Sequence, residues 1–165
     1  MTEVQFIKIT SFFRKNKFRE NSLKFFCTFT PLLVAFIYAI TIIFLIINKD
    51  KNLNLFLFVP ASNFLFISVM RKLLNKSRPY DLFNHTPIVK YSKGKGKSFP
   101  SRHTSSAFVI AISYFYINYI YIGLFMLAVA CIVGLSRIIA GVHFPRDIIA
   151  AALISIIWAI AGFSI

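Results

Sequence analysis

A run of 37 residues beginning at Thr104 contains almost only apolar side chains. As a single helix rising 1.5 Å per residue it would be roughly 55 Å long, whereas the hydrocarbon core of a bilayer is about 30 Å thick. The chain must therefore turn back within this run. Its polar interruption is the stretch INYIYIG, which predicts a tight hairpin near Asn118 and Tyr119 between spans at about 102–118 and 120–138.

Three further apolar runs, at about 25–47, 53–70 and 147–164, bring the expected total to about five spans. The second run contains Pro60, which a membrane helix tolerates when a neighbour satisfies the carbonyl that the proline leaves without a donor. The chain is 58% hydrophobic, above the roughly 45 to 50% of a soluble domain. We therefore expect an all-α membrane protein, a helical bundle of about five transmembrane helices occupying residues 25–165.

Residues 1–24 mix aromatic and basic side chains at roughly helical spacing. This pattern is typical of an amphipathic helix on a membrane surface, although a solvated basic tail is an open alternative. The whole chain carries a net charge of +14, which in a soluble protein would suggest a nucleic acid partner. Here the charges lie between apolar runs, so we expect membrane lipids and a phosphorylated substrate as partners, and no nucleic acid.

Five spans with these boundaries place the loop 71–101 and the segment 136–147 on the same membrane face. Within that loop, the glycine-lysine run at 90–98 predicts mobility. All basic residues except Lys49 and Lys51 also fall on this face. Because Lys and Arg near spans prefer the cytoplasm, the count favours a cytoplasmic site in the cell membrane. Phosphate binding is an alternative reason for the same charges, so the face stays open.

Three polar clusters meet at this face, namely RKLLNKSRP, FPSRHT and SRIIAGVHFPRD (71–79, 99–104 and 136–147). Arg78 and Arg137 offer forked donors that match phosphate oxygens. Ser101 and the first amides of a helix beginning near Arg102 form an anion site at a helix N-terminus. These residue types together favour a phosphate-binding site at the membrane rim.

Two histidines in these clusters supply proton-transfer chemistry. His103 and His143 can act as a proton donor and a nucleophile, because imidazole titrates near neutral pH. Asp147 lies one helical turn after His143, where a carboxylate accepts the imidazole N–H and stabilises the cation formed on attack. The alternative for Asp147 alone is a cap on the last span.

The order and spacing of these residues resemble the motifs of the type-2 phosphatidic acid phosphatase family, whose fold is shared with vanadium haloperoxidases. Its three blocks are K-x6-R-P, P-S-G-H and S-R-x5-H-x3-D. The matching residues are Arg78 and Pro79 in the first block, Pro100, Ser101 and His103 in the second, and Ser136, Arg137, His143 and Asp147 in the third. The resemblance covers about residues 53–164, and the three blocks together make it specific.

This resemblance implies a lipid phosphatase that acts on a phosphomonoester or diphosphate, such as phosphatidate, phosphatidylglycerophosphate or undecaprenyl diphosphate. By the same resemblance His143 is the nucleophile that forms a phosphohistidine, Asp147 is its partner, and His103 protonates the leaving alcohol. The implied phosphate ligands are Arg71, Arg78, Ser101 and Arg137. No metal or organic cofactor is implied.

Two positions depart from the family motifs. Arg71 stands where the family has Lys, which keeps the charge but brings a larger, planar group. Arg102 replaces the Gly between Ser101 and His103; it keeps the backbone amide, and its side chain either points away or contacts the substrate. Because a second phosphate is one candidate for that contact, Arg102 joins the expected phosphate-binding residues.

Two other functions remain open from the sequence. A catalytically inactive family member would bind lipid phosphates or act as a membrane scaffold, although all the expected catalytic side chains are present. An anion channel or transporter is less favoured, because the spans carry no ionisable residue to line a path.

Overall fold

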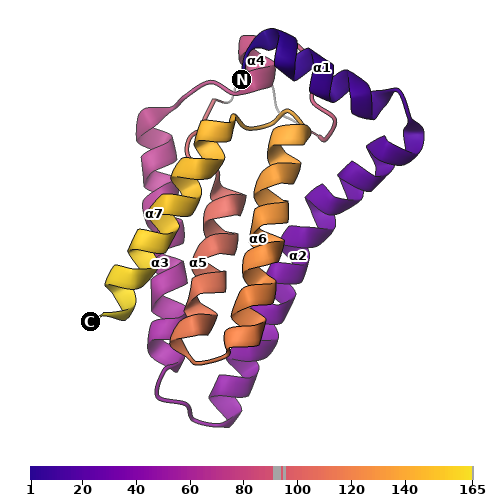
Figure 1. Cartoon of the computed structure of the whole chain (residues 1–165). Coiled ribbons are helices and arrows are strands. Elements are labelled where there is room, and N and C mark those ends of the chain that lie inside the picture. Colours follow the sequence, from indigo (N-terminus) through magenta and orange to yellow (C-terminus); the bar gives the residue numbers. More distant parts are fainter. Residues whose placement is uncertain (91–93, 95, 165) are drawn as a thin grey trace.

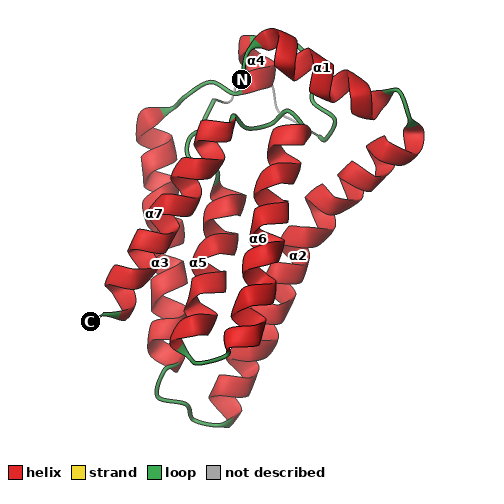
Figure 2. Ribbon diagram, in the orientation of Figure 1, coloured by secondary structure: helices red, strands yellow, loops and turns green. Residues whose placement is uncertain are grey.

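The computed structural model describes residues 1–90, 94 and 96–164, and these residues form seven helices and no strand (Figures 1 and 2). The helices in chain order are α1 (Glu3–Arg14), α2 (Lys17–Ile47), α3 (Leu53–Leu74), α4 (Pro79–Leu82), α5 (Arg102–Tyr116), α6 (Ile120–Ile139) and α7 (Pro145–Phe163). The expected all-α bundle is confirmed. Part of the glycine-lysine run, at residues 91–93 and 95, lies outside the described residues.

The predicted hairpin is present between α5 and α6. Asn118 adopts a left-handed conformation with a φ of 62°, and the amide of Tyr119 donates to the carbonyl of Tyr114 at 2.9 Å. Asparagine tolerates this conformation better than other residues with a side chain. The two helices therefore run antiparallel and pack along their length (Figure 1).

Helix α5 differs from the predicted span at 102–118. It has only 15 residues, and it packs against α2, α3, α6 and α7. Its buried residues are Thr104, Ser105, Ala107, Phe108, Val109, Ile110, Ala111, Ser113 and Tyr114. In the described part of the chain, four helical segments are long and apolar enough to cross a membrane: Lys17–Ile47, Leu53–Leu82, Ile120–Ile139 and Pro145–Phe163. The fifth expected span is thus a short central helix surrounded by protein.

Helix α2 begins at Lys17, eight residues before the membrane span expected at 25–47, and contains that span. The side chain of Asn16 caps this helix by accepting from the amides of Phe18 and Arg19 at 2.9 and 3.3 Å. A side-chain cap of this kind satisfies amides that have no partner within the helix. Capping, rather than the start of the apolar run, decides where α2 begins.

Helix α1 is packed onto the protein and is not a solvated tail. Phe6 is 1% exposed and shares a buried cluster with Tyr80, Ile88 and Val142. Arg14 at the other end of α1 donates to the carbonyls of Thr86 and Pro87 at 2.7 and 3.1 Å. Helix α1 therefore covers the end of the bundle where the loops after α3 and α6 meet (Figure 1).

A buried polar contact joins three helices of the bundle. The amide nitrogen of Asn63 in α3 donates to the hydroxyls of Ser105 in α5 and Ser155 in α7 at 2.8 and 3.3 Å. The two hydroxyls lie 2.6 Å apart. In a membrane the hydrophobic effect does not drive helices together, because lipid tails are as apolar as the helix faces. Hydrogen bonds between helices therefore help to hold a membrane bundle together. This contact fixes α5 relative to α7, the two helices whose first turns carry His103 and Asp147.

The proline in α3 is accommodated as the sequence predicts. Pro60 has no N–H to donate to the carbonyl of Phe56, four residues earlier. The hydroxyl of Tyr38 in α2 donates to that carbonyl at 2.8 Å. A side chain of a neighbouring helix thus satisfies the backbone group that the proline leaves without an internal partner.

Gly141, in the loop after α6, lies where α1 comes close to that loop. It has a φ of 77°, and an added Cβ would lie 2.6 Å from Cε2 of Phe6. Gly94 has a similar φ of 70° but open space around the same position. We expect Gly141→Ala to lower the free energy of unfolding by about 1 to 3 kcal/mol more than Gly94→Ala, because only Gly141→Ala adds overpacking to backbone strain. Thermal unfolding in detergent measures both, and equal losses would contradict this packing of α1.

Candidate active site

A cavity of about 910 Å³ opens at the end of the bundle covered by α1. Its lining residues are Arg71, Arg78, Tyr80, Val89, Lys90, Gly96, Lys97, Arg102, His103, Arg137, Val142 and His143. Six of these are Lys or Arg and none is Asp or Glu. A concave surface with one sign of charge concentrates ligands of the opposite sign, so the cavity is suited to an anion. The described residues contain no group of three His, Cys, Asp or Glu that would hold a metal ion.

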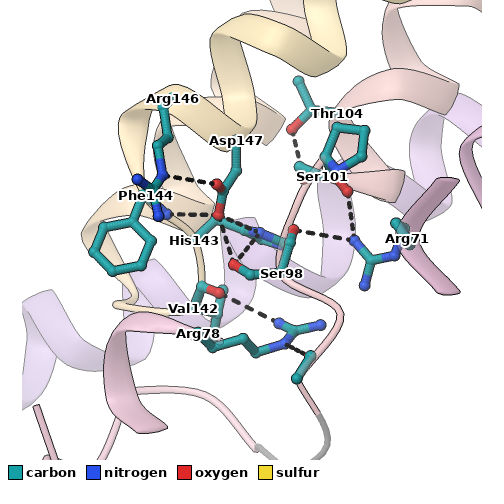
Figure 3. A network of polar contacts seen from close by, with 12 residues as sticks. Arg71, Arg78, Ser98, Ser101, Thr104, Val142, His143, Phe144, Arg146 and Asp147 are labelled. Atoms are coloured by element: carbon teal, nitrogen blue, oxygen red, sulfur yellow. Dashed lines mark hydrogen bonds and ion pairs between the residues drawn. The ribbon is translucent and has the colours of Figure 1, made fainter. Parts of the chain in front are cut away.

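His143 and Asp147 form a buried pair at one wall of the cavity (Figure 3). His143 lies in the loop before α7, and Asp147 lies in the first turn of that helix. The imidazole Nδ1 is 3.3 Å from the carboxylate Oδ2, and the two residues are 2% and 0% exposed. A proton on Nδ1 that is donated to Asp147 leaves the lone pair of Nε2 free for chemistry. This is the geometry expected from their spacing in the sequence.

The same carboxylate oxygen accepts two further hydrogen bonds. The hydroxyl of Ser98 donates to Oδ2 of Asp147 at 2.5 Å, and the amide of Phe144 donates to it at 3.0 Å. The second oxygen, Oδ1, lies 3.8 Å from Nε of Arg146. Asp147 therefore acts both as the helix cap and as the partner of His143, two roles that the sequence presents as alternatives.

Sequence reasoning missed Ser98. Its side chain is fully buried, and its hydroxyl also lies 3.5 Å from Nδ1 of His143. Ser98 precedes the FPSRHT cluster, but its partner Asp147 is 49 residues away. Only the fold brings the two together. Tyr80, Lys90 and Lys97 were likewise not expected to line the cavity, because the loop that carries the lysines shows no motif.

The imidazole of His143 is held in its neutral form. Burial lowers the pKa of His143 from 6.5 to about 4, and the hydrogen bond to Asp147 opposes this effect only in part. The nearby positive charges of Arg78 and Arg71 lower the pKa of His143 further. At neutral pH the ring therefore carries a lone pair that is available for attack.

Arg71 stands on the last turn of α3 and is tied to the segment before α5. Its Nη1 donates to the carbonyl of Pro100 at 2.6 Å and to that of Ser98 at 3.3 Å (Figure 3). Arg71 is 8% exposed, and it lines the cavity. The forked guanidinium that replaces the family's lysine thus uses one nitrogen for the main chain and presents the others to the cavity.

Two more of the expected arginines are also anchored by main-chain carbonyls. Arg78 donates from Nε to Gly96 at 3.2 Å and from Nη1 to Val142 at 3.3 Å. Arg137 donates from Nη2 to the carbonyl of Cys27 at 2.8 Å. A carbonyl orients a guanidinium without cancelling its charge, whereas a carboxylate would compete with a bound anion. The positive charges therefore remain available to a phosphate.

Ser101 and Asp147 lie behind the cavity wall, whereas the other expected site residues line it. Ser101 is fully buried, and its hydroxyl accepts from the hydroxyl of Thr104 at 3.0 Å. Its amide donates to the backbone carbonyl of Asp147 at 3.1 Å, which ties the start of α5 to the start of α7. The residues that the structure brings together around the cavity are Arg71, Arg78, Arg102, His103, Arg137 and His143.

Arg102 and His103 separate the charged cavity from an apolar groove. The guanidinium of Arg102 lies 5.3 Å from the centre of the Phe64 ring. Both Arg102 and His103 also border a groove of about 270 Å³ whose other lining residues are Pro31, Val34, Ala35, Phe64, Ser106, Ala107 and Ile110. The side chain that replaces the family's glycine thus lies between a polar and an apolar binding surface.

The chain is similar to a known protein family in sequence and to solved membrane proteins in fold. The family model described as "PAP2 superfamily" matches residues 52–165. The structure of LpxE from Aquifex aeolicus superposes with a TM-score of 0.76 at 25% identity, covering 98% of this chain and 93% of that one. A transmembrane PAP2-type phosphatidylglycerolphosphate phosphatase from Bacillus subtilis gives 0.73 at 19% identity, covering 98% and 82%. No curated protein matches the chain in sequence.

The lowered pKa of His143 predicts a loss of stability in acid. The folded value of about 4 lies below the unfolded value of 6.5, so unfolding takes up a proton between these two pH values. Stability from this group is complete above about pH 6.5 and falls as the pH drops towards 4. Thermal unfolding in detergent at about pH 7 and pH 4.5 should show a smaller acid loss for His143→Gln than for the wild type. An equal loss in both proteins would show that His143 does not titrate in this way.

Proposed function

The chain belongs to the PAP2 superfamily, and we propose that it hydrolyses a phosphomonoester or diphosphate of a membrane lipid through a phosphohistidine intermediate. The family expected from the three motifs is confirmed, and so is the expectation of a multi-pass membrane phosphatase. The observation that carries the mechanism is the neutral His143, paired through Nδ1 with Asp147 at the wall of a cavity lined by six cationic side chains.

In the first step, the terminal phosphate binds among Arg71, Arg78 and Arg137. Nε2 of His143 attacks phosphorus, and the bond from phosphorus to the leaving oxygen breaks. Asp147 accepts the Nδ1 proton in a hydrogen bond and stabilises the imidazolium. His103 lines the same cavity, where burial and the neighbouring arginines lower its pKa to about 3. The negative charge of the bound phosphate raises this pKa, and His103 then donates a proton to the leaving oxygen.

In the second step, a water molecule replaces the leaving group beside His103. His103, now neutral, takes a proton from this water as the water oxygen attacks phosphorus. The bond between phosphorus and Nε2 breaks, and inorganic phosphate leaves. Both histidines return to their starting protonation states, so the cycle needs no further reactant.

The lipid character of the substrate is supported by the groove beside His103. The leaving part of the substrate must lie on the His103 side of the phosphate, and the apolar groove begins there. Phosphatidate, phosphatidylglycerophosphate and undecaprenyl diphosphate all fit this description, since each joins a phosphate to long apolar chains. One structural neighbour is named for phosphatidylglycerolphosphate, but at 19% identity its substrate does not transfer to this chain.

We place the site at the cytoplasmic face of the cell membrane. In the described part of the chain, only Lys49 and Lys51 among the basic residues lie in the α2–α3 loop, at the end of the bundle opposite the cavity (Figure 1). The basic residues of α1 and of the first turns of α2 add to the charge at the cavity end without lining the cavity. Loops rich in Lys and Arg stay in the cytoplasm, which favours lipids made on that side.

A phosphate-release screen of the purified protein in detergent tests the proposal against these three lipids and p-nitrophenyl phosphate. His143→Ala should abolish release from every substrate, because no nucleophile remains. His103→Ala should spare the first turnover of p-nitrophenyl phosphate, measured as a burst of nitrophenolate, and impair the first turnover of the lipids by about 100-fold or more, since only a poor leaving group needs the proton in the first step. Release by a well-folded His143→Ala would refute the mechanism. No release by the wild type from any substrate would favour the inactive, lipid-binding alternative.

Arg102 should distinguish diphosphates from monophosphates. When His143 attacks the terminal phosphorus of a lipid diphosphate, the second phosphate leaves towards His103 and Arg102. Arg102→Ala should lower kcat/KM for undecaprenyl diphosphate about tenfold, the loss of one charge-assisted hydrogen bond, and leave phosphatidate unchanged. Lys72→Ala is the control, because it removes an exposed charge on the same face. Equal losses on both lipids would show that Arg102 does not select the second phosphate.

A further inference from the structure

A second proline lies inside a membrane helix, and its effect reaches the cavity. Pro31 is within α2, where the amide of residue 31 would normally donate to the carbonyl of Cys27. Proline has no such amide, and its ring presses against the carbonyl four residues earlier. The carbonyl of Cys27 is thus left without this donor.

The group that takes up this carbonyl is a phosphate-site arginine. Nη2 of Arg137, in the last turn of α6, donates to the Cys27 oxygen at 2.8 Å. Helices α2 and α6 pack against each other, and Arg137 lines the cavity beside His143. We infer that Pro31 is a positioning residue, which holds Arg137 in place for phosphate by exposing the carbonyl of Cys27.

The other proline helix shows the same chemistry without a link to the cavity. Pro60 leaves the carbonyl of Phe56, which accepts from the hydroxyl of Tyr38 at 2.8 Å. None of these three residues lines the cavity. In both helices a proline thus leaves one backbone carbonyl without its helical donor. The carbonyl of Phe56 accepts from Tyr38, which lies away from the cavity, and the carbonyl of Cys27 accepts from Arg137, which lines it.

The form of the contact suits a phosphate ligand. The carbonyl uses one nitrogen of Arg137 and leaves its charge intact, and Nε of the same side chain is buried without a hydrogen-bond partner. A buried donor that lacks a partner is unfavourable until an acceptor arrives, and a phosphate oxygen is such an acceptor. Pro31 and Cys27 lie outside residues 52–165, so this contact to Arg137 comes from a part of the chain that the family model does not cover.

Pro31→Ala tests this inference, which rests on the proposed function for its kinetic part. The new amide of residue 31 bonds the Cys27 carbonyl within the helix and draws it away from Arg137. We expect kcat/KM for p-nitrophenyl phosphate to fall about tenfold, as for loss of one hydrogen bond to a charged group. The dissociation constant of orthovanadate, measured by calorimetry, should rise by a similar factor. Pro60→Ala is the control and should change neither value.

A double-mutant cycle separates positioning from a general change in α2. In an Arg137→Lys background, Pro31→Ala should cause no further loss of kcat/KM, because the shorter cation does not depend on the carbonyl in the same way. Equal losses in both backgrounds, or unchanged orthovanadate affinity in Pro31→Ala, would overturn the inference. Orthovanadate binding needs no turnover. A wild type that binds it but releases no phosphate would therefore defeat the proposed function and leave this inference standing.

Discussion

One carboxylate oxygen, Oδ2 of Asp147, ties together the segments on which the site depends. It accepts from Ser98 before α5, from His143 in the loop after α6, and from the amide of Phe144 at the start of α7. A buried carboxylate is costly unless it is hydrogen-bonded, so these segments must all be in place for the charge to be tolerated. The hydrogen bonds that stabilise this buried carboxylate therefore also bring together the segments around His143.

The membrane sets a second requirement, that backbone groups find partners within the protein. In α2 and α3 this requirement links helices, because each proline leaves a carbonyl that a side chain of another helix binds. The central helix α5 has no proline and is held by packing and by the serine and asparagine contact. The bundle thus places one of its cationic side chains, Arg137, through a hydrogen bond that also links two helices.

Local patterns predicted much of the fold and the site. The pairing of His143 with Asp147 follows from a spacing of four residues, and the hairpin at Asn118 follows from the length of one apolar run. Contacts between residues far apart in the sequence could not be predicted from local patterns. Ser98 meets Asp147 because the start of α5 packs against α7, and Arg137 meets Cys27 because α6 packs against α2. The start of α2 at Lys17 also could not be read from the apolar run, because the cap at Asn16 sets it.

The anchors of the three arginines have a consequence for how such a protein can evolve. Gly96, Val142, Ser98, Pro100 and Cys27 contribute carbonyl oxygens, which every amino acid possesses. Replacing the side chain of Val142 or Cys27 leaves the acceptor in the chain, provided that the backbone keeps its path. Ser98 is constrained by its hydroxyl, which donates to Asp147, and Gly96 by its φ of 53°. Part of the surroundings of the site is thus free to drift in sequence while its geometry persists, in keeping with a shared fold at 19 to 25% identity.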